Sequence, residues 1–489
     1  MTLTEQELLA KVPTGLYIGG QWVEGHGENR IAVEDPATGK VLAEIANATA
    51  EDALAALKAA DDVQASWARV APRERGEILR RTFELVRARS AEFATLISLE
   101  MGKPLAEARG EVVYGNEFLR WFSEEAVRIS GRYGSNPEGT GRMLVTQRPV
   151  GPAFAITPWN FPLAMATRKI GPAIAAGCTM VVKPAELTPL TTLLLVKTME
   201  EAGLPAGVVN VITTSTSAAT SAPVIADARL RKITFTGSTQ VGVKLLEQSA
   251  KQVLRTSMEL GGNAPFLVFE DADIDAAVNG AMLAKMRNIG QACTAANRFI
   301  IHDSVADEFA QKFAAKMDAL QLGRGVAEGT TCGPVINEKA RENMQRLVDA
   351  TVREGGDVVA GGESAAGDGY FFKPTVLDNV KPGSTILQEE IFGPIAPIVR
   401  FKSEEEAVRL ANDTQYGLVS YAFTQDLKRG LRLAETLDTG MTGLNSGLVS
   451  NAAAPFGGVK QSGLGREGGL EGIDEYLETK YVMIPDPQA

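Results

Sequence analysis

Residues 153–183 read AFAITPWNFPLAMATRKIGPAIAAGCTMVVK: a short apolar run, a longer stretch rich in small residues, and a second apolar run. The apolar runs at 153–157 and 179–182 predict strands, and the stretch at 163–176 predicts a helix. The same alternation continues downstream, with strands expected at 208–211 and 232–235 and helices at 189–202 and 218–226. Strands alternating with helices predict a parallel sheet with its ligand at the carboxyl ends of the strands, as in nucleotide-binding domains.

A second α/β block is predicted to begin after Gly261-Gly262. Residues 266–269 predict a strand, and Asp273 is expected to cap a helix with apolar residues at four-residue spacing. Two further strand-like segments, 143–146 and 481–484, lie outside both blocks. Extended segments of this kind often pair with another subunit.

The composition limits the function classes. The chain has 489 residues, which is above the roughly 250–300 at which single cores tend to split, so two or three domains are expected. Its net charge of −11 argues against non-specific nucleic-acid binding, and no stretch of 18 apolar residues predicts a membrane span. Cys178, Cys293 and Cys332 are too few and too scattered for a disulfide framework or a zinc cluster, so we expect a cytoplasmic protein without metal.

The chain contains two histidines, His26 in a polar run and His302 after an apolar triplet. Histidine-based catalysis therefore has few candidates, and a general base is expected to be a carboxylate. Glu259 is one candidate, because it ends an apolar strand and apolar surroundings raise the pKa of a carboxyl toward neutrality. A structural glutamate at the domain boundary is the alternative for this segment alone.

Cys293 lies in the segment NIGQACT at 288–294. Its small neighbours leave room for a carbonyl to approach the sulfur, and a thiolate there would be a nucleophile. For Cys178 and Cys332, the expected role is that of buried, inert thiols.

Two turns could bind a dinucleotide. The segment FTGSTQVG at 235–242 is a glycine-containing turn between a strand and a helix, where backbone amides can approach phosphate. It departs from the G-x-G-x-x-G fingerprint, so a plain turn remains an alternative. In VVKPAE at 181–186, Lys183 and Glu186 could bind the adenine ribose, and the carboxylate would repel a 2′-phosphate. The alternative for this second turn is a solvated charged loop.

Seven motifs occur in the order and spacing of the aldehyde dehydrogenase superfamily, and the chain resembles that family over essentially its whole length. The motifs are TPWNFP at 157–162, KPAE at 183–186, TGS at 236–238, MELGGN at 258–263, QACT at 291–294, EEIFGP at 389–394 and PFGG at 455–458. The resemblance implies the family's α/β fold: a Rossmann-like cofactor domain, a second α/β catalytic domain and a small β oligomerisation arm. We assign residues 1–130 and 150–258 to the cofactor domain, 259–450 to the catalytic domain, and 131–149 and 462–489 to the arm.

The same resemblance implies an oxidation of aldehydes. Cys293 would attack the aldehyde, the Asn160 side chain and the Cys293 N–H would hold the oxyanion, and Glu259 would activate water to hydrolyse a thioester. The implied NAD(P)-binding residues are Trp159, Lys183, Pro184, Ala185, Glu186, Gly237, Ser238, Leu260, Glu390 and Phe392. NAD is expected to be preferred because of Glu186, although NADP remains an alternative.

Within the family, the chain is most similar to bacterial succinate-semialdehyde dehydrogenases. The motifs TRK at 167–169, KMRN at 285–288 and VSN at 449–451 carry this closer match. It implies that Arg168, Arg287 and Ser450 bind the distal carboxylate of the substrate, and a guanidinium suits that role. Ala295 occupies the position of a second cysteine in some relatives, so a disulfide switch is not expected.

Several alternatives remain open. The substrate could be glutarate or 2-oxoglutarate semialdehyde, or the protein could be a general aldehyde dehydrogenase. A CoA-acylating enzyme is disfavoured by Glu259, and a catalytically silent binding protein is disfavoured by the joint presence of Cys293, Glu259 and Asn160. The resemblance also implies a homodimer or homotetramer acting on a small acid aldehyde.

Overall fold

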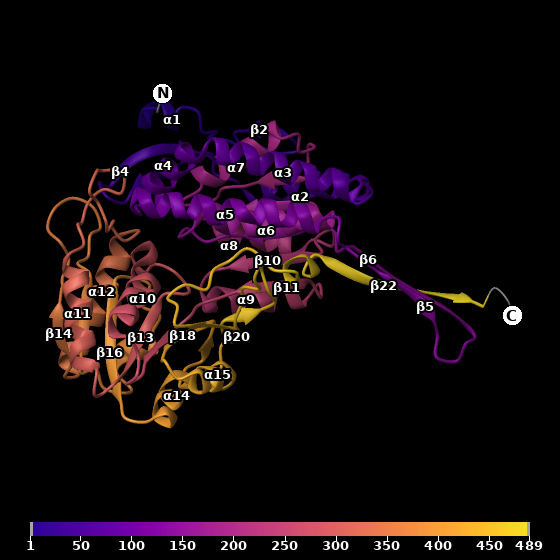
Figure 1. The fold of residues 1–489 in the computed structure, drawn as a ribbon. Coiled ribbons are helices and arrows are strands. Elements are labelled where there is room, and N and C mark those ends of the chain that lie inside the picture. The colour runs from indigo at the N-terminus through magenta and orange to yellow at the C-terminus, as the bar shows by residue number, and fades with distance from the viewer. Residues whose placement is uncertain (1–2, 487–489) are drawn as a thin grey trace.

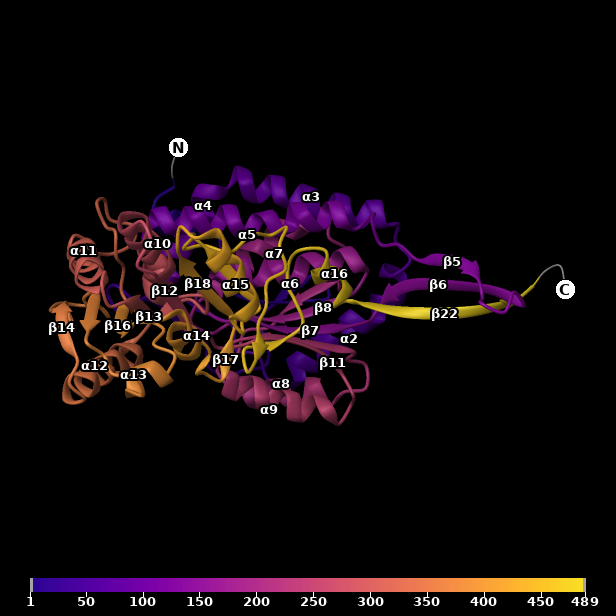
Figure 2. The same ribbon diagram turned by 60° about the horizontal axis from the view of Figure 1, so that its bottom comes forward.

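The computed structural model describes residues 3–486 and consists of two α/β lobes and a projecting arm (Figures 1 and 2). The first lobe is built on an eight-stranded sheet with the strand order β2-β1-β9-β8-β7-β10-β11-β21. Its five central strands run parallel. They are β7 (Ala153–Ile156), β8 (Met180–Lys183), β9 (Val209–Val211), β10 (Lys232–Thr236) and β11 (Arg255–Glu259). The antiparallel edges are β1 (Leu16–Ile18), β2 (Gln21–Val23) and β21 (Gly463–Leu464).

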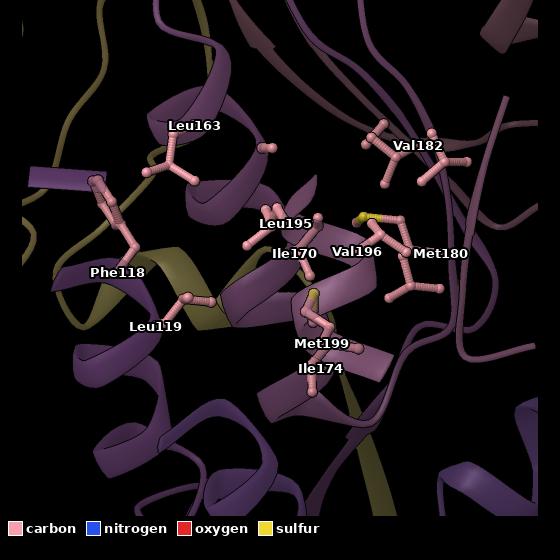
Figure 3. Packing of buried hydrophobic residues seen from close by; sticks show 14 of the residues in the cluster. Phe118, Leu119, Leu163, Ile170, Ile174, Met180, Val182, Leu195, Val196 and Met199 are labelled. Atoms are coloured by element: carbon pink, nitrogen blue, oxygen red, sulfur yellow. The ribbon is translucent and has the colours of Figure 1, made fainter. Parts of the chain in front are cut away.

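Helices cover both faces of this sheet because its strands alternate their side chains between two cores. Ala153 and Ala155 face one core, whereas Phe154 and Ile156 face the other. The first core receives α3 (Pro72–Ala88), α4 (Ser90–Met101), α5 (Leu105–Glu125), α6 (Pro162–Ala176) and α7 (Leu190–Glu201). The second receives α2 (Ala50–Trp67), α8 (Ser217–Ala226) and α9 (Thr239–Ala250). Figure 3 shows Phe118 and Leu119 of α5, Ile170 of α6 and Val182 of β8 in the first core.

Local sequence signals account for the ends of several helices. The Pro162 ring occupies the first turn of α6, and Gly177 ends this helix in a left-handed conformation with a φ of 93°. The Asp273 side chain accepts a hydrogen bond from Ala276 N and caps α10 (Ile274–Met286), as predicted. The predicted strands and helices of the first block are also confirmed, with ends within about two residues of those observed.

The second lobe is built on a seven-stranded sheet with the order β14-β15-β16-β13-β12-β18-β19. Its strands are β12 (Ala264–Val268), β13 (Ala296–His302), β14 (Asp357–Ala360), β15 (Thr375–Asp378), β16 (Ile395–Phe401), β18 (Val419–Phe423) and β19 (Met441–Leu444). Its helices, besides α10, are α11 (Ala306–Asp318), α12 (Glu338–Arg353), α13 (Thr385–Gln388), α14 (Glu404–Asn412) and α15 (Leu427–Thr436). Phe266 packs against Phe299 and Phe423 at the centre of this core. Together, the two sheets confirm the predicted α/β fold class.

The arm is a three-stranded antiparallel sheet of β5 (Arg132–Ser135), β6 (Gly141–Pro149) and β22 (Leu477–Pro485), and it extends away from both lobes (Figure 1). The predicted strand-like segments pair here, with Met143 opposite Met483. The arm differs from the assigned range at one boundary. Residues 462–476 contain β21, which pairs with β11, and α16 (Glu471–Asp474), which packs on α6, so this stretch belongs to the first lobe.

The remaining elements are short: α1 (Glu5–Leu9), the hairpin of β3 (Ile31–Asp35) and β4 (Lys40–Ile45), the pair β17 (Tyr416–Gly417) and β20 (Val459–Lys460), and the 3₁₀ turn η1 (Arg287–Gly290). Among the helices formed by residues 3–486, none combines the length and the hydropathy required to span a bilayer.

Candidate active site

A cavity of about 210 Å³ lies where the carboxyl ends of β7, β10 and β11 meet the second lobe. The parallel register brings distant residues together: Asn160 follows β7, Gly237 follows β10, and Glu259 ends β11. The second lobe contributes the loop that carries Cys293. The cavity is lined by Pro158, Trp159, Asn160, Met165, Thr236, Gly237, Ser238, Leu260, Gly261, Cys293, Glu390 and Phe392. Eight of the residues singled out from the sequence thus line one cavity, and Glu259 lies at the end of β11.

Cys293 is the half-buried thiol of the three, whereas Cys178 and Cys332 are buried. Burial raises the pKa of Cys293 to about 12, and the nearby negative charges of Glu259 and Glu390 act in the same direction. The guanidinium groups of Arg168 and Arg287 oppose this rise. The thiol is therefore protonated at neutral pH and needs a base before it can act as a nucleophile.

Glu259 is 3% exposed, and neither of its carboxylate oxygens has a hydrogen-bond partner among residues 3–486. Burial raises its pKa well above the ordinary value, and repulsion from Glu467 adds to the rise. The nearby cations Arg168 and Lys169 oppose it. A buried carboxyl without partners and with a raised pKa has the properties of a general base.

Asn160 is 4% exposed, and its Nδ2 donates a hydrogen bond to the backbone oxygen of Gln291 at 3.0 Å. This bond fixes the amide of Asn160 against the loop that carries Cys293. Because an amide nitrogen has two hydrogens, one N–H remains available to a second acceptor. Such a donor beside a nucleophile can stabilise an oxyanion.

The glycines, the buried hydroxyl and the helix N-terminus at the cavity fit a dinucleotide. A Cβ at Gly237 would lie 2.4 Å from the Phe235 ring, and one at Gly261 would lie 2.9 Å from Glu390 Oε2, so a side chain at either position would displace a residue of the site. The buried Thr236 Oγ1 has no partner in the described part of the chain, and Ser238 precedes the first turn of α9. Backbone N–H groups at a helix N-terminus that a ligand can approach closely are suited to binding phosphate.

Of the residues predicted to bind the adenine ribose, Lys183 ends β8 and Glu186 follows it, and neither lines the cavity. Lys183 Nζ donates to Ser217 Oγ at 3.0 Å and to Pro184 O at 3.3 Å, and the nearby Glu186 is half-buried. Burial lowers the pKa of Lys183, and Glu186 opposes that change. Nothing in the sequence distinguishes Ser217 as a site residue, because a serine that begins a helix is ordinary.

Glu390 Oε1 accepts a hydrogen bond from Gly262 N at 3.1 Å, and burial raises the pKa of Glu390 to about 7. The Trp159 and Phe392 rings meet edge to face, with their centroids 5.5 Å apart. Leu260, which follows β11, lines the cavity between these groups. Pro184 and Ala185 occupy the turn after β8.

The three predicted carboxylate-binding residues lie in different surroundings. Arg287 Nη1 donates to Ser450 Oγ at 3.0 Å, so these two residues, distant in sequence, form one polar site. Arg168 is 1% exposed and forms an ion pair with Glu467, with its guanidinium 4.0 Å above the Phe456 ring. Its Nη2 has no hydrogen-bond partner within residues 3–486. Arg168 is therefore partly neutralised, a feature that the sequence did not predict.

Tyr114 of α5 was also missed. Its buried hydroxyl has no hydrogen-bond partner in residues 3–486, and the Arg287 guanidinium lies 5.4 Å from its ring centroid. It packs on the apolar cluster of Phe161, Met165, Ala292 and Ala295 beside Cys293. Nothing in the helical spacing of α5 distinguishes this tyrosine from a core residue. Within the described residues, no group of three His, Cys, Asp or Glu side chains could hold a metal ion.

Comparisons with known proteins agree with this geometry. A sequence model of the aldehyde dehydrogenase family matches residues 22–482. A succinate-semialdehyde dehydrogenase of Paenarthrobacter nicotinovorans is 61% identical over 447 residues, covering 91% of this chain and 99% of that protein. A glutarate-semialdehyde dehydrogenase of Pseudomonas putida is 46% identical over 468 residues, covering 96% and 97%. The crystal structure of an Escherichia coli NADP-dependent enzyme superposes with a TM-score of 0.96 at 44% identity, covering 97% and 98%. These matches confirm the resemblance seen in the motifs, and the chain belongs to the aldehyde dehydrogenase family.

Proposed function

We propose that this enzyme oxidises succinate semialdehyde to succinate through a thioester on Cys293. The observation that carries the proposal is the hydrogen bond from Arg287 to Ser450, together with the position of both Arg287 and Arg168 close enough to Cys293 for their charges to act on its thiol. Two guanidinium groups and a hydroxyl match the distal carboxylate of a short acid aldehyde. The 61% identity to a succinate-semialdehyde dehydrogenase supports the same substrate.

The residues suggest the order of steps. The Glu259 carboxylate takes the Cys293 proton, and the thiolate forms a C–S bond to the aldehyde carbon. The resulting oxyanion accepts hydrogen bonds from the Asn160 amide and the Cys293 N–H, and losing one such donor costs about 2.7–4 kcal/mol. A bound nicotinamide coenzyme would supply the hydride acceptor, and the C–H bond breaks as the oxyanion reforms a C=O bond.

The product of that step is a thioester on Cys293. Glu259, after losing the Cys293 proton to solvent, takes a proton from a water molecule as the water oxygen bonds to the thioester carbon. The C–S bond then breaks, which releases the carboxylic acid and regenerates the Cys293 thiolate, and this thiolate takes back the proton that Glu259 removed from water. The overall change consumes one aldehyde, one water and one oxidised coenzyme.

We infer that NAD is preferred over NADP. The half-buried Glu186 follows β8 beside Lys183, and a carboxylate there accepts hydrogen bonds from ribose hydroxyls but repels a 2′-phosphate. The E. coli enzyme is NADP dependent, whereas a betaine aldehyde dehydrogenase of Staphylococcus aureus was solved in complex with NAD+, so both coenzymes occur among proteins of this fold.

The domain assignment leads to one further proposal, that the arm joins copies of this chain into a homodimer or homotetramer. Exposed apolar side chains on the arm support it, because Tyr133, Tyr481 and Met483 are 64%, 55% and 45% exposed in the single chain. A measured solution mass equal to that of one chain would contradict it.

The other acid aldehydes remain a second candidate, favoured by the 46% identity to a glutarate-semialdehyde dehydrogenase. The deciding experiment measures kcat/KM for succinate semialdehyde, glutarate semialdehyde and butanal, each with NAD and with NADP. We expect succinate semialdehyde to exceed butanal by about 10²-fold or more. An equal kcat/KM for butanal would indicate a general aldehyde dehydrogenase. A higher kcat/KM for glutarate semialdehyde than for succinate semialdehyde would indicate a glutarate-semialdehyde dehydrogenase.

A further inference from the structure

We propose that Lys103 and Glu107 are positioning residues. They hold the Asn160 loop and the Cys293 loop in the relative position that attack on the aldehyde requires. The proposal rests on the thioester route above, and it concerns two residues outside the cavity lining. Lys103 lies between α4 and α5, and Glu107 is in the first turn of α5.

Lys103 is fully buried. Its Nζ donates to Glu111 Oε2 at 2.5 Å and to the backbone oxygen of Asn160 at 2.9 Å, and it lies 4.0 Å from the Phe161 ring centroid. The three N–H groups of the ammonium therefore face a carboxylate, a carbonyl and an aromatic ring. Two of these partners belong to the loop that presents the proposed oxyanion donor.

Glu111 extends this anchor into α6. Its Oε1 accepts hydrogen bonds from Leu163 N at 3.0 Å and Ala164 N at 3.3 Å, in the first turn of the helix. These donors have no partner within the helix itself. The Lys103–Glu111 pair thus fixes both Asn160 and the start of the helix that carries Arg168.

Glu107 anchors the other loop. Its carboxylate accepts a hydrogen bond from Asn288 N. The Asn288 Nδ2 donates to Asn160 O at 3.0 Å and to Gln291 O at 2.8 Å, and the Asn160 Nδ2 also donates to Gln291 O. The bonds close a ring that connects α5, the Asn160 loop and the residues just before Cys293.

The backbone before Cys293 needs such an anchor because it is strained. Asn288 and Ile289 have φ values of 58° and 59°, and Gly290 follows with 72°. A β-branched residue in the left-handed region is a genuine outlier, and each such residue costs about 1–3 kcal/mol. Strain of this size persists only where surrounding contacts over-determine the conformation, and Glu107 supplies the contact to Asn288 N.

Loss of the anchor should therefore affect the chemical step. A displacement of about 1 Å at a reacting group can cost about 10²-fold in rate. We expect Lys103→Met and Glu107→Met each to lower kcat per active site by about 10- to 100-fold, with KM changing by less than about threefold. Glu107→Gln should recover most of the rate, because its amide oxygen can still accept from Asn288 N.

Glu100 provides a matched control. It is a fully buried carboxylate at the end of α4 that accepts from Leu190 N at 2.7 Å and Thr191 N at 2.9 Å. It caps α7 in the way that Glu111 caps α6, but none of its hydrogen bonds reaches the loops of Asn160 or Cys293. Glu100→Gln should lower the melting temperature without lowering kcat per active site.

The experiment combines active-site titration, single-turnover NADH formation and alkylation of Cys293 by iodoacetamide over a range of pH, all on the full-length enzyme. Slower single turnover and a changed alkylation profile in both Met variants, with recovery in Glu107→Gln, would support the proposal. The proposal would be overturned if Lys103→Met and Glu107→Met lose as much stability as Glu100→Gln but keep the wild-type kcat per active site. If Lys103→Met does not fold, the two Glu107 variants decide. Alkylation of Cys293 needs no aldehyde, so it tests the positioning role independently of the substrate. Failure of the wild-type enzyme to oxidise any of the aldehydes would refute the proposed function alone.

Discussion

Replacement of Arg287 by methionine tests the carboxylate site most directly. The side chain is half-buried, and its Nη1 donates to Ser450 Oγ at 3.0 Å. Arg287→Met keeps an apolar stem of similar length and removes the charge and all five N–H donors. Ser450 is itself partly exposed, so water can replace the lost hydrogen bond and the variant should fold.

The expected magnitude follows from the number of contacts. A hydrogen bond to a charged group contributes about 1.5–3 kcal/mol, and a guanidinium can make two with one carboxylate. Water will satisfy part of the carboxylate in the variant, and Arg168 remains. We therefore expect a net loss of about 3 kcal/mol, or roughly 10²-fold in kcat/KM for succinate semialdehyde, at 1.4 kcal/mol for each factor of ten.

The assay compares succinate semialdehyde with butanal by steady-state NADH formation. For butanal, which has no distal charge, kcat/KM should change by less than about threefold. Arg120→Met is a suitable control, because Arg120 is an exposed arginine on α5 that lines the groove next to Ser450 and pairs with Glu117. Arg120→Met should leave kcat/KM nearly unchanged for both aldehydes.

Arg168→Met should behave differently from Arg287→Met. Arg168 forms a buried ion pair with Glu467, and removing one partner of a buried pair is strongly destabilising. We expect it to lower the rates for both aldehydes as well as the melting temperature. If Arg287→Met lowers kcat/KM equally for succinate semialdehyde and butanal, Arg287 is structural and does not bind the distal carboxylate.

Three other predictions concern the remaining site residues. Cys293→Ala should abolish turnover while NAD binding, measured by calorimetry, stays within about twofold, and appreciable residual activity would exclude the thiol as the nucleophile. Glu259→Gln should slow both the first turnover of NADH formation and the hydrolysis of the thioester, because the same carboxylate is proposed to act in both steps; because the Glu259 pKa is raised, the wild-type deacylation rate should increase as pH rises through that raised value, and a flat profile would contradict its role as a base. Glu186→Ser should raise kcat/KM with NADP relative to NAD by about tenfold, and an unchanged ratio would place coenzyme selection elsewhere.

The sequence predicted the first lobe well, because each parallel strand is a short apolar run and each helix has a clear start. The run at 179–182 corresponds to β8 (Met180–Lys183), and Asp273 caps α10 as expected. The motifs also placed Asn160 and Cys293, which line one cavity. What these cases share is that the signal lies within a few neighbouring residues.

Contacts between distant segments could not be predicted in this way. Glu467 lies in a glycine-rich loop near the C-terminus, and nothing there indicates that it pairs with Arg168 and Lys169 on α6. The arm boundary differs for the same reason, because only the pairing of β21 with β11 ties that stretch to the first lobe. Tyr114 is indistinguishable from a core residue until the fold places it beside Arg287.

The charge balance around Glu467 gives a physical reason for selecting an acid aldehyde. One carboxylate pairs with two buried cations, Arg168 and Lys169, and the positive charges of Arg168 and Arg287 both act on Cys293. Glu259 does not offset them when protonated, and its raised pKa extends the pH range in which it is neutral. A buried excess of positive charge is costly unless it is paired. The distal carboxylate of the substrate would complete the balance, whereas an uncharged aldehyde would remove water from the cations without replacing its hydrogen bonds.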